Sequence, residues 1–224
     1  MKIIHHQTID STNLEAKRLL NAGKKPPFII LAAEQTEGKG QGEHIWETQS
    51  GKNLTCSFVI EPKIEPQSQY LNTVAISVSI KILLEKYIPQ THKIKIKWPN
   101  DIYVGDSKIC GILINNKVLG NEIQSSIIGV GINVNQTEFP AHLPNPISIK
   151  LITGEDILID ELLKEFIAIA EENFLLMRRN PQQLISTYTN NLYKLNEPAM
   201  YNINGQFVER CISGIDEFGG IMTE

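Results

Sequence analysis

Residues 93–114, with the sequence KIKIKWPNDIYVGDSKICGILI, decide the fold that we expect for the chain. Lysine and isoleucine alternate at the start of this stretch, a period-2 pattern typical of a β-strand with one solvated face. Gly105-Asp106 is a tight-turn signal. Residues 102–104 and 108–114 are therefore predicted to be strands joined by a hairpin, next to a strand at 93–98.

The same periodicity, followed outward, predicts strands and helices in an irregular order. Short apolar runs predict strands at 2–6, 28–33, 53–60 and 125–134, and residues 194–224 return to strand-like patterning. Helices are predicted from Thr12, over 67–87, over 156–178 and over 182–193, with Leu71, Val74, Val78 and Ile82 of the second facing inward. Thr12 and Glu15 fit a capping box at the first helix. Strands that come mostly first, with helices clustered late, indicate an α+β fold.

A domain boundary is expected where the last helix breaks. Asn190-Asn191 and the run Asn196-Glu197-Pro198 interrupt the helical pattern. We therefore expect a catalytic domain over 1–193 and a C-terminal segment over 194–224, which is too short to fold independently.

Composition excludes several classes of protein. The 224 residues are 42% hydrophobic and 21% charged, enough apolar content for a core, and the net charge of −4 gives no overall attraction to nucleic acid or anionic lipid. The three cysteines are far apart, which indicates reduced thiols rather than a zinc site or disulfides. The sequence shows no signal peptide and no apolar run near the ~20 residues of a membrane span. We expect a soluble cytoplasmic protein with no nucleic-acid or membrane partner.

Residues 35–42, QTEGKGQG, form the first candidate site. Glycine at alternate positions lets a backbone approach a ligand and direct amide N–H groups at an anion. Lys39 adds a positive charge. The spacing matches neither a Walker loop nor a dinucleotide fingerprint. The alternative is a flexible surface loop.

The second and third candidates lie within residues 93–114. Asn100 and Asp101 follow Trp98-Pro99 at a strand end, a common place for a polar site, although a polar turn with Trp98 in the core is the alternative. Lys108 begins an apolar strand, where it can hold an anion in poorly hydrated surroundings. An exposed turn lysine is the alternative.

Residues 129–135, GVGINVN, are the fourth candidate. Glycines inside a strand are typical of places where a ligand or another backbone approaches closely. Asn133 can pair with a base or a hydroxyl, whereas a β-bulge with surface asparagines is the alternative. The histidines show no metal-ligand spacing.

Taken in order, these motifs resemble the biotin protein ligases. Asp10-Ser11-Thr12-Asn13 is similar to the D-S-T-N opening of that family, and residues 35–46 are similar to its glycine-rich loop ending in tryptophan. Residues 97–101, KWPND, match its most specific signature, and residues 108–113 and 129–133 match K-x-x-G-I-L and G-x-G-I-N.

The resemblance implies a fold, a reaction and a partner. The fold is a mixed β-sheet flanked by helices, related to class II aminoacyl-tRNA synthetases, with a small SH3-like C-terminal barrel that looks incomplete here. The reaction activates biotin with ATP as biotinyl-5′-AMP, with Mg²⁺, and transfers biotin to a lysine of a biotin carboxyl carrier protein. We expect a monomer or a homodimer.

The resemblance also implies roles for individual residues. Catalysis would fall to Lys108, Lys39 and Asp101, with Asp101 either orienting or deprotonating the acceptor amine or helping to hold Mg²⁺. Biotin would contact Ser11, Thr12, Asn13, Gln35, Lys39, Gly40, Gln41, Lys108 and Gly111. The adenylate would contact Gly38, Trp46, Asn53, Asn100, Gly131 and Asn133. No residue is expected to form a permanent metal site.

Two departures and two alternatives accompany the resemblance. Gly42-Glu43-His44 replaces basic residues of the family loop, and we expect Glu43 to point away from a phosphate. No helix-turn-helix precedes residue 10, so repressor activity is not expected. A lipoate–protein ligase shares the implied fold and adenylate chemistry, and a non-catalytic biotin- or nucleotide-binding module is the other alternative.

Overall fold

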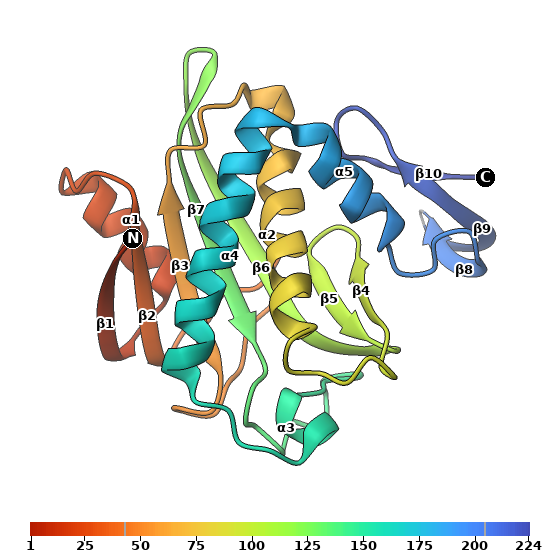
Figure 1. Ribbon diagram of the computed structural model, residues 1–224, viewed down its shortest axis with the longest axis horizontal. Coiled ribbons are helices and arrows are strands. Elements are labelled where there is room, and N and C mark those ends of the chain that lie inside the picture. The colour runs from red at the N-terminus through yellow and green to blue at the C-terminus, as the bar shows by residue number, and fades with distance from the viewer. Residues whose placement is uncertain (43, 204) are drawn as a thin grey trace.

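A seven-stranded mixed sheet forms the centre of the protein in the computed structural model, which describes residues 1–42, 44–203 and 205–224 (Figure 1). The strands are ordered β1-β2-β3-β7-β6-β5-β4. Only β1 and β2 pair in parallel; the other neighbours are antiparallel. Their bounds are β1 (Lys2–Ile9), β2 (Phe28–Gln35), β3 (Leu54–Ile60), β4 (Ile94–Lys97), β5 (Asp101–Val104), β6 (Ser107–Leu119) and β7 (Glu122–Ile132).

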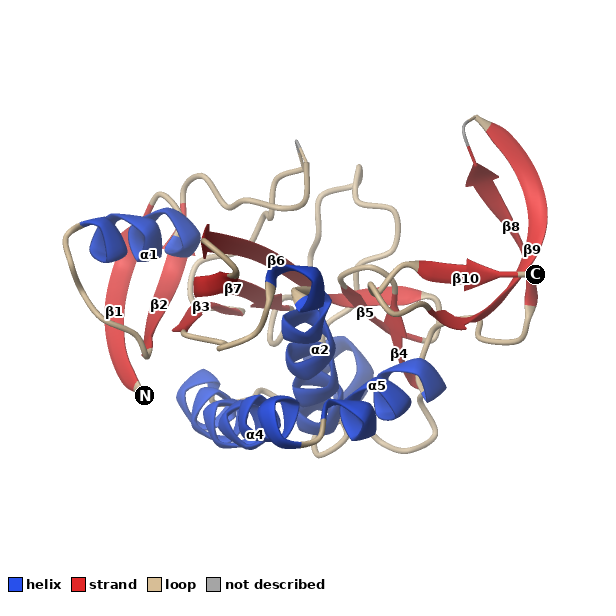
Figure 2. Ribbon diagram, turned by 90° about the horizontal axis from the view of Figure 1, so that it is seen from above, coloured by secondary structure: helices blue, strands red, loops and turns tan. Residues whose placement is uncertain are grey.

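Three helices cover one face of the sheet, and the long loops lie on the other (Figure 2). The covering helices are α2 (Tyr70–Leu84), α4 (Ile159–Arg179) and α5 (Pro181–Asn190). The main hydrophobic core lies between them and the sheet. Most residues of α2 are buried on both sides, because α2 is packed between the sheet and α4. This arrangement leaves the opposite face of the central strands open for a site.

Helix α1 (Thr12–Asn21) packs on that opposite face, at the β1–β2 edge (Figure 2). Alternation along β2 explains how both faces are filled, since Phe28 and Ile30 join a small cluster with Ala16 of α1, whereas Ile29 and Leu31 enter the main core. The start of α1 is thereby fixed against the end of β2, which places the turn at Ser11 beside the open face.

The expected fold class is confirmed, and several details differ from the prediction. Strands β4, β5 and β6 form the predicted hairpins, with the turn at Gly105-Asp106. Ile82 is 37% exposed, so its predicted inward position is wrong; Ile80, Leu83 and Leu84 form the buried face of the last turn instead. The short helices η1 (Pro66–Ser68) and α3 (Ile149–Thr153) were not predicted, because a single turn leaves no periodic pattern.

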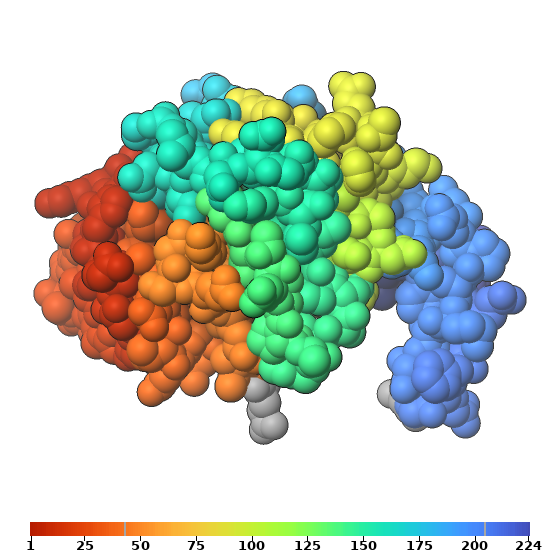
Figure 3. All heavy atoms as spheres, turned by 90° about the horizontal axis from the view of Figure 1, so that it is seen from below, coloured from red at the N-terminus to blue at the C-terminus, as the bar shows by residue number. Residues whose placement is uncertain are grey.

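A separate three-stranded antiparallel sheet follows α5. Its order is β10-β9-β8, with β8 (Pro198–Ile203), β9 (Gln206–Ile215) and β10 (Ile221–Thr223). A notch divides most of it from the rest of the surface (Figure 3). The indole Nε1 of Trp98 donates a hydrogen bond to the carbonyl of Gly219 across 2.9 Å, so Trp98 joins the two sheets instead of entering the core. The proposed division at residues 193 and 194 remains a prediction.

Within the part of the chain that the structure describes, no helix has both the length and the apolar content needed to cross a membrane.

Candidate active site

A cavity of about 460 Å³ opens on the face of the sheet opposite α2 and α4. It collects segments that are far apart in the sequence: the turn before α1, the loop after β2, the β4–β5 corner, the middle of β6 and β7, and residues 139–146. Most of the predicted site residues line it, namely Ser11, Thr12, Asn13, Gln35, Lys39, Gly40, Gln41, Trp46, Asn100, Asp101, Lys108, Gly111, Gly131 and Asn133. Gly38 and Asn53 do not.

Lys108 faces Asp101 inside the cavity. The Nζ atom of Lys108 lies 2.8 Å from Oδ1 of Asp101, and the two side chains are 33% and 19% exposed. The same ammonium lies 5.7 Å from the ring centre of Trp46. The backbone of Lys108 is fixed on its other side, because its N–H donates to the carbonyl of Asn145. Lys108 is therefore a half-buried cation fixed by Asp101 and not an exposed turn lysine.

Trp46 lies against two glycines that are direct partners on β6 and β7. A Cβ atom on Gly131 would lie 2.3 Å from Cε2 of Trp46, and one on Gly111 would lie 2.9 Å from Cζ3. Non-bonded atoms do not come this close, so the indole can lie here only because both positions lack side chains. The glycines at these positions predict that some group approaches the strands closely, and in this structure that group is the indole of Trp46.

The turn before α1 brings neutral polar groups to the opposite end of the cavity. The N–H and hydroxyl of Thr12 donate to Oε1 of Gln35, at 2.7 and 2.9 Å. Ser57 Oγ lies 2.7 Å from Thr12 Oγ1 and 2.6 Å from Asn13 Oδ1. This network fixes the side chains of Thr12, Asn13 and Gln35 relative to one another.

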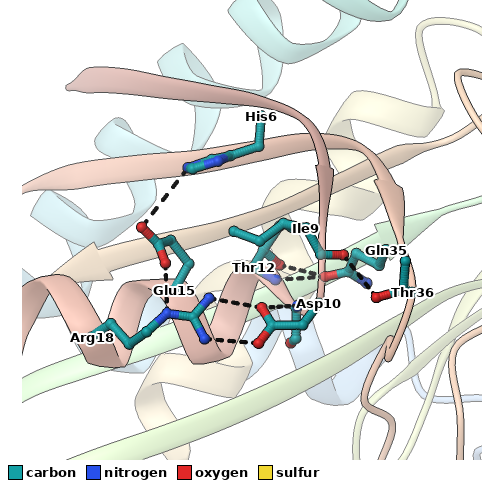
Figure 4. Close-up of polar contacts among 9 residues, drawn as sticks. His6, Ile9, Asp10, Thr12, Glu15, Arg18, Gln35 and Thr36 are labelled. Atoms are coloured by element: carbon teal, nitrogen blue, oxygen red, sulfur yellow. Dashed lines mark hydrogen bonds and ion pairs between the residues drawn. The ribbon is translucent and has the colours of Figure 1, made fainter.

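The predicted capping box at α1 is wrong. Thr12 is the first helical residue, and Ser11 occupies the N-cap position without a side-chain bond to a first-turn amide. Glu15 Oε2 instead accepts a hydrogen bond from Nε of Arg18, and the two guanidinium amino groups of Arg18 bind both oxygens of Asp10 (Figure 4). A competing ion-pair network therefore takes the carboxylate that the capping box would have used.

Asp10 gives a testable pH dependence. The hydrogen bonds from Arg18 lower the pKa of this carboxyl to about 2 from an ordinary 3.8. Because the folded-state pKa is depressed, the stabilisation from the charged form is complete above pH ~4 and is lost as the pH falls toward ~2. We expect Asp10→Asn to lower the urea midpoint at pH 7, and we expect the difference from wild type to shrink between pH 4 and pH 2.5. A difference that stays constant over this range would contradict the assignment.

The glycine-rich loop is a narrow hairpin. Lys39 and Ile45 form a bridge, Gly40 N–H donates to the carbonyl of His44 at 2.8 Å, and Trp46 N–H donates to that of Gly38 at 3.0 Å. The amide of Gly40, one of the glycine N–H groups expected to face an anion, is thus used inside the loop, whereas an anion contact by the Gly38 amide stays a prediction. From this loop, the cavity is lined by residues 39–41 and 44–47. Glu43 lies outside the described residues.

Three asparagines proposed for the adenylate hold the backbone in place. Asn53 is buried away from the cavity, where it accepts from Val134 N–H and donates to Gln136. Asn100 Nδ2 donates to the carbonyl of Ile112 at 2.8 Å, and Asn133 Nδ2 donates to that of Ile147 at 3.0 Å. Each of these Nδ2 groups carries a second N–H, so the amides of Asn100 and Asn133 still offer a ligand one donor and the oxygen acceptor.

The sequence prediction missed several lining residues. Lys97 lies on the cavity face because it is the cross-strand partner of Asp101, and its Nζ donates to the hydroxyl of Tyr103 at 2.9 Å. The alternation of residues 93–98 already places Lys97 on the solvated face of the strand, so the sequence contained a signal that could have identified Lys97 as a lining residue. Residues 139–146 also form a wall, and their proline-rich sequence has no periodicity that predicts it.

Among the described residues, those that line the cavity carry an excess of positive charge. Lys39, Lys97 and Lys108 line it, against the carboxylates of Asp101 and Glu47, and Glu47 is paired with His142 at 2.8 Å. Among the residues described, no three histidine, cysteine, aspartate or glutamate side chains cluster as a metal site. Burial raises the pKa of the Cys110 thiol well above its usual value, as expected of a core residue rather than a nucleophile.

Comparison with known proteins identifies the family. The model of the biotin/lipoate A/B protein ligase family matches residues 5–133. The chain belongs to this family. The resemblance to biotin protein ligases that the motifs indicate is therefore confirmed, and the matched span of this ligase family contains Lys108, Asp101 and both glycines under Trp46.

Individual relatives agree with the family assignment. The bifunctional ligase/repressor BirA of Bacillus subtilis is 33% identical over 159 residues, 69% of this chain and 48% of that protein. A human biotin–protein ligase is 36% identical over 114 residues, 48% of this chain and 15% of that protein. The chain thus spans about half the length, or less, of these curated relatives.

A solved structure gives the same fold. The biotin protein ligase from Aquifex aeolicus, in complex with biotin and ATP, superposes with a TM-score of 0.81 at 24% identity, covering 100% of this chain and 95% of that one.

Proposed function

We propose that this chain activates biotin with ATP as biotinyl-5′-AMP and transfers biotin to a lysine of a biotin carboxyl carrier domain. One observation carries the proposal: a half-buried ammonium, Lys108, lies beside Asp101 and 5.7 Å from the ring centre of an indole laid on two glycines, in a cavity that also holds a neutral polar pocket. The names of the relatives, biotin–protein ligases among them, support the choice of biotin.

The first step joins two anions, which explains the lysines. An oxygen of the biotin carboxylate attacks the α-phosphorus of ATP, a C–O–P bond forms, and the bond to the β-phosphate oxygen breaks to release pyrophosphate. The nucleophile and the phosphate repel each other, so fixed positive charge between them lowers the barrier. Lys108 is placed by Asp101 to bridge the two anions, and Lys39 and Lys97 add charge at the cavity wall.

The second step transfers the acyl group. The neutral amine of the carrier lysine attacks the acyl carbon, an amide bond forms, the bond to the phosphate oxygen breaks, and AMP leaves as the nitrogen loses its proton. Asp101, beside Lys108, is the carboxylate that we assign to orienting or deprotonating that amine. Mg²⁺ is usually held by one or two carboxylates together with substrate phosphates, so Asp101 also fits the metal that accompanies ATP.

The two ends of the cavity suit the two parts of the intermediate. Ser11, Thr12, Asn13 and Gln35 supply neutral donors and acceptors, which suit the ureido ring of biotin. Trp46 presents an aromatic face on which adenine can stack. Gly131 and Gly111 keep Trp46 in place, while Gly40 and Gln41 border the path between the ends.

Lipoate is the alternative substrate, because the family description includes lipoate ligases. A dithiolane ring offers no strong hydrogen-bonding group to Ser11, whose hydroxyl makes no hydrogen bond to any described residue, and burying that hydroxyl without a partner would be unfavourable. The polar end of the cavity therefore favours biotin. The intact Lys108–Asp101 pair argues against a binding module without catalysis.

Transfer to a carrier domain tests the proposal. With protein, ATP, Mg²⁺ and a biotin carboxyl carrier domain, we expect biotin to produce a streptavidin-reactive band and the mass increase of one biotinyl group. Lipoate in place of biotin should give no mass increase on a lipoyl or a biotin carrier domain. Modification by lipoate alone would make the chain a lipoate ligase, and modification by neither would refute the transfer step.

A further inference from the structure

Helix α1 begins without a side-chain cap. Ser11 is the N-cap residue, and a serine there usually stabilises a helix by ~1 kcal/mol through its hydroxyl. Here the hydroxyl makes no hydrogen bond to any described residue, and Ser11 lines the cavity. The helix thus forgoes a common source of stability at the point where a polar group faces the proposed ligand.

The contacts of Arg18 with Asp10 and Glu15, which we call the Arg18 clamp, take the place of the cap (Figure 4). The two amino nitrogens of Arg18 bind the two oxygens of Asp10, each at 2.7 Å, and its Nε binds Oε2 of Glu15 at 2.7 Å. Asp10 Oδ1 also accepts the N–H of Ser11 at 2.7 Å. An isolated surface ion pair contributes little, but a two-pronged arginine–carboxylate contact within a network has fixed geometry.

Asp10 is the junction of two walls of the cavity. Its carbonyl accepts the N–H of Glu37 at 2.8 Å, and the preceding carbonyl, of Ile9, accepts that of Thr36 at 2.9 Å. On the other side of Asp10 the chain continues directly into Ser11 and Thr12. Asp10, which is bound by Arg18, therefore fixes both the turn before α1 and the start of the glycine-rich loop.

We propose that Arg18 is a positioning residue for the ring end of the ligand site, acting through Asp10 to keep Ser11 and Thr12 aligned against Gln35. The inference rests on the proposed function, because it takes biotin as the ligand of that end. Neither Arg18 nor Asp10 lines the cavity, so Arg18 does not touch the ligand itself. Without the guanidinium, Asp10 would lose its charged partner and Glu15 would keep only His6, whose Nε2 lies 4.0 Å from its Oε1, among the described residues, so the turn would loosen.

The test compares two substitutions on the same helix. Arg18→Met removes the clamp, and Lys17→Met removes the same charge from a neighbouring exposed position that makes no ion pair with the described residues. By calorimetry, we expect Arg18→Met to weaken biotin binding by about tenfold, ~1.4 kcal/mol. We expect Lys17→Met to bind like wild type. At saturating biotin the Arg18→Met enzyme should form the adenylate at nearly the wild-type rate. Arg18→Lys keeps the positive charge but loses the two-pronged guanidinium, so its biotin affinity should lie between those of Arg18→Met and the wild type.

A double-mutant cycle tests whether Arg18 acts through Asp10. In an Asp10→Asn background, Arg18→Met should add less than a twofold further loss of biotin affinity. A full tenfold loss in that background would overturn the proposal, as would wild-type biotin affinity in Arg18→Met with only a lower melting temperature. If the wild-type protein binds no biotin, the proposed function fails together with this inference, whereas wild-type binding with an unaffected Arg18→Met fails this inference alone.

Discussion

Lys108→Met is expected to lower the rate of biotinyl-AMP formation by about 10²- to 10³-fold, the range typical for removing one preorganised charge stabiliser. Methionine replaces the aliphatic part of the side chain, but it removes the ammonium that lies 5.7 Å from the Trp46 ring centre and that neutralises carboxylate and phosphate. Asp101 would also lose its partner at 2.8 Å and add an uncompensated negative charge to the cavity. Single-turnover formation of labelled biotinyl-AMP measures the effect.

Lys117→Met provides the matched control for this substitution. Lys117 lies on the same strand, β6, is exposed, and does not line the cavity. The control should form the adenylate at the wild-type rate, and both variants should melt near the wild-type temperature, since Lys108 is one-third exposed. An unimpaired Lys108→Met enzyme would remove the central cation from the mechanism.

Gly131→Ala is expected to have the second large effect, on ATP affinity. The added methyl group would lie 2.3 Å from Trp46, so the indole must leave its place over β6 and β7. Overpacking of this kind typically costs about 1–3 kcal/mol of stability. Because the displaced indole can no longer offer its face to adenine, we expect ATP binding to weaken by at least about tenfold, within the ~1–3 kcal/mol of one stacked base. Calorimetric titration with ATP measures the change.

The double variant Trp46→Ala/Gly131→Ala separates the two causes. If the clash with the indole is the whole effect, adding Gly131→Ala to Trp46→Ala should cost less than about twofold in ATP affinity. Gly131→Ala should then affect affinity only when the tryptophan is present. ATP binding by Gly131→Ala at the wild-type affinity would show that the position of Trp46 is irrelevant to the nucleotide.

Local patterns in the sequence predicted the elements near the site well. Alternation in residues 93–98 and the Gly105-Asp106 turn are short-range signals, and they predicted the β4–β5–β6 hairpins correctly. The glycines at 129 and 131 predicted a close approach within β7. That the approaching groups are Asn13 and Trp46 depends on the strand order, which no local pattern encodes.

Other features depended on competition between side chains. Thr12 and Glu15 match a capping box, but Arg18 lies one turn along the helix from Glu15 and also reaches Asp10. The ion pairs of Arg18 with Asp10 and Glu15 therefore form in place of the capping box. Asn53 resembles a ligand-binding residue in sequence, yet a buried amide must find partners, and Val134 and Gln136 supply them. The wall at residues 139–146 is irregular backbone, which periodicity cannot predict.

Exchange of labelled pyrophosphate into ATP isolates the activation of biotin, because it needs only the first step and no carrier domain. We expect exchange that requires biotin, is absent when lipoate replaces biotin, and falls by about 10²-fold or more in Lys108→Met. Exchange that proceeds without biotin, or that Lys108→Met leaves unchanged, would contradict the claim that this cavity activates the biotin carboxylate beside Lys108.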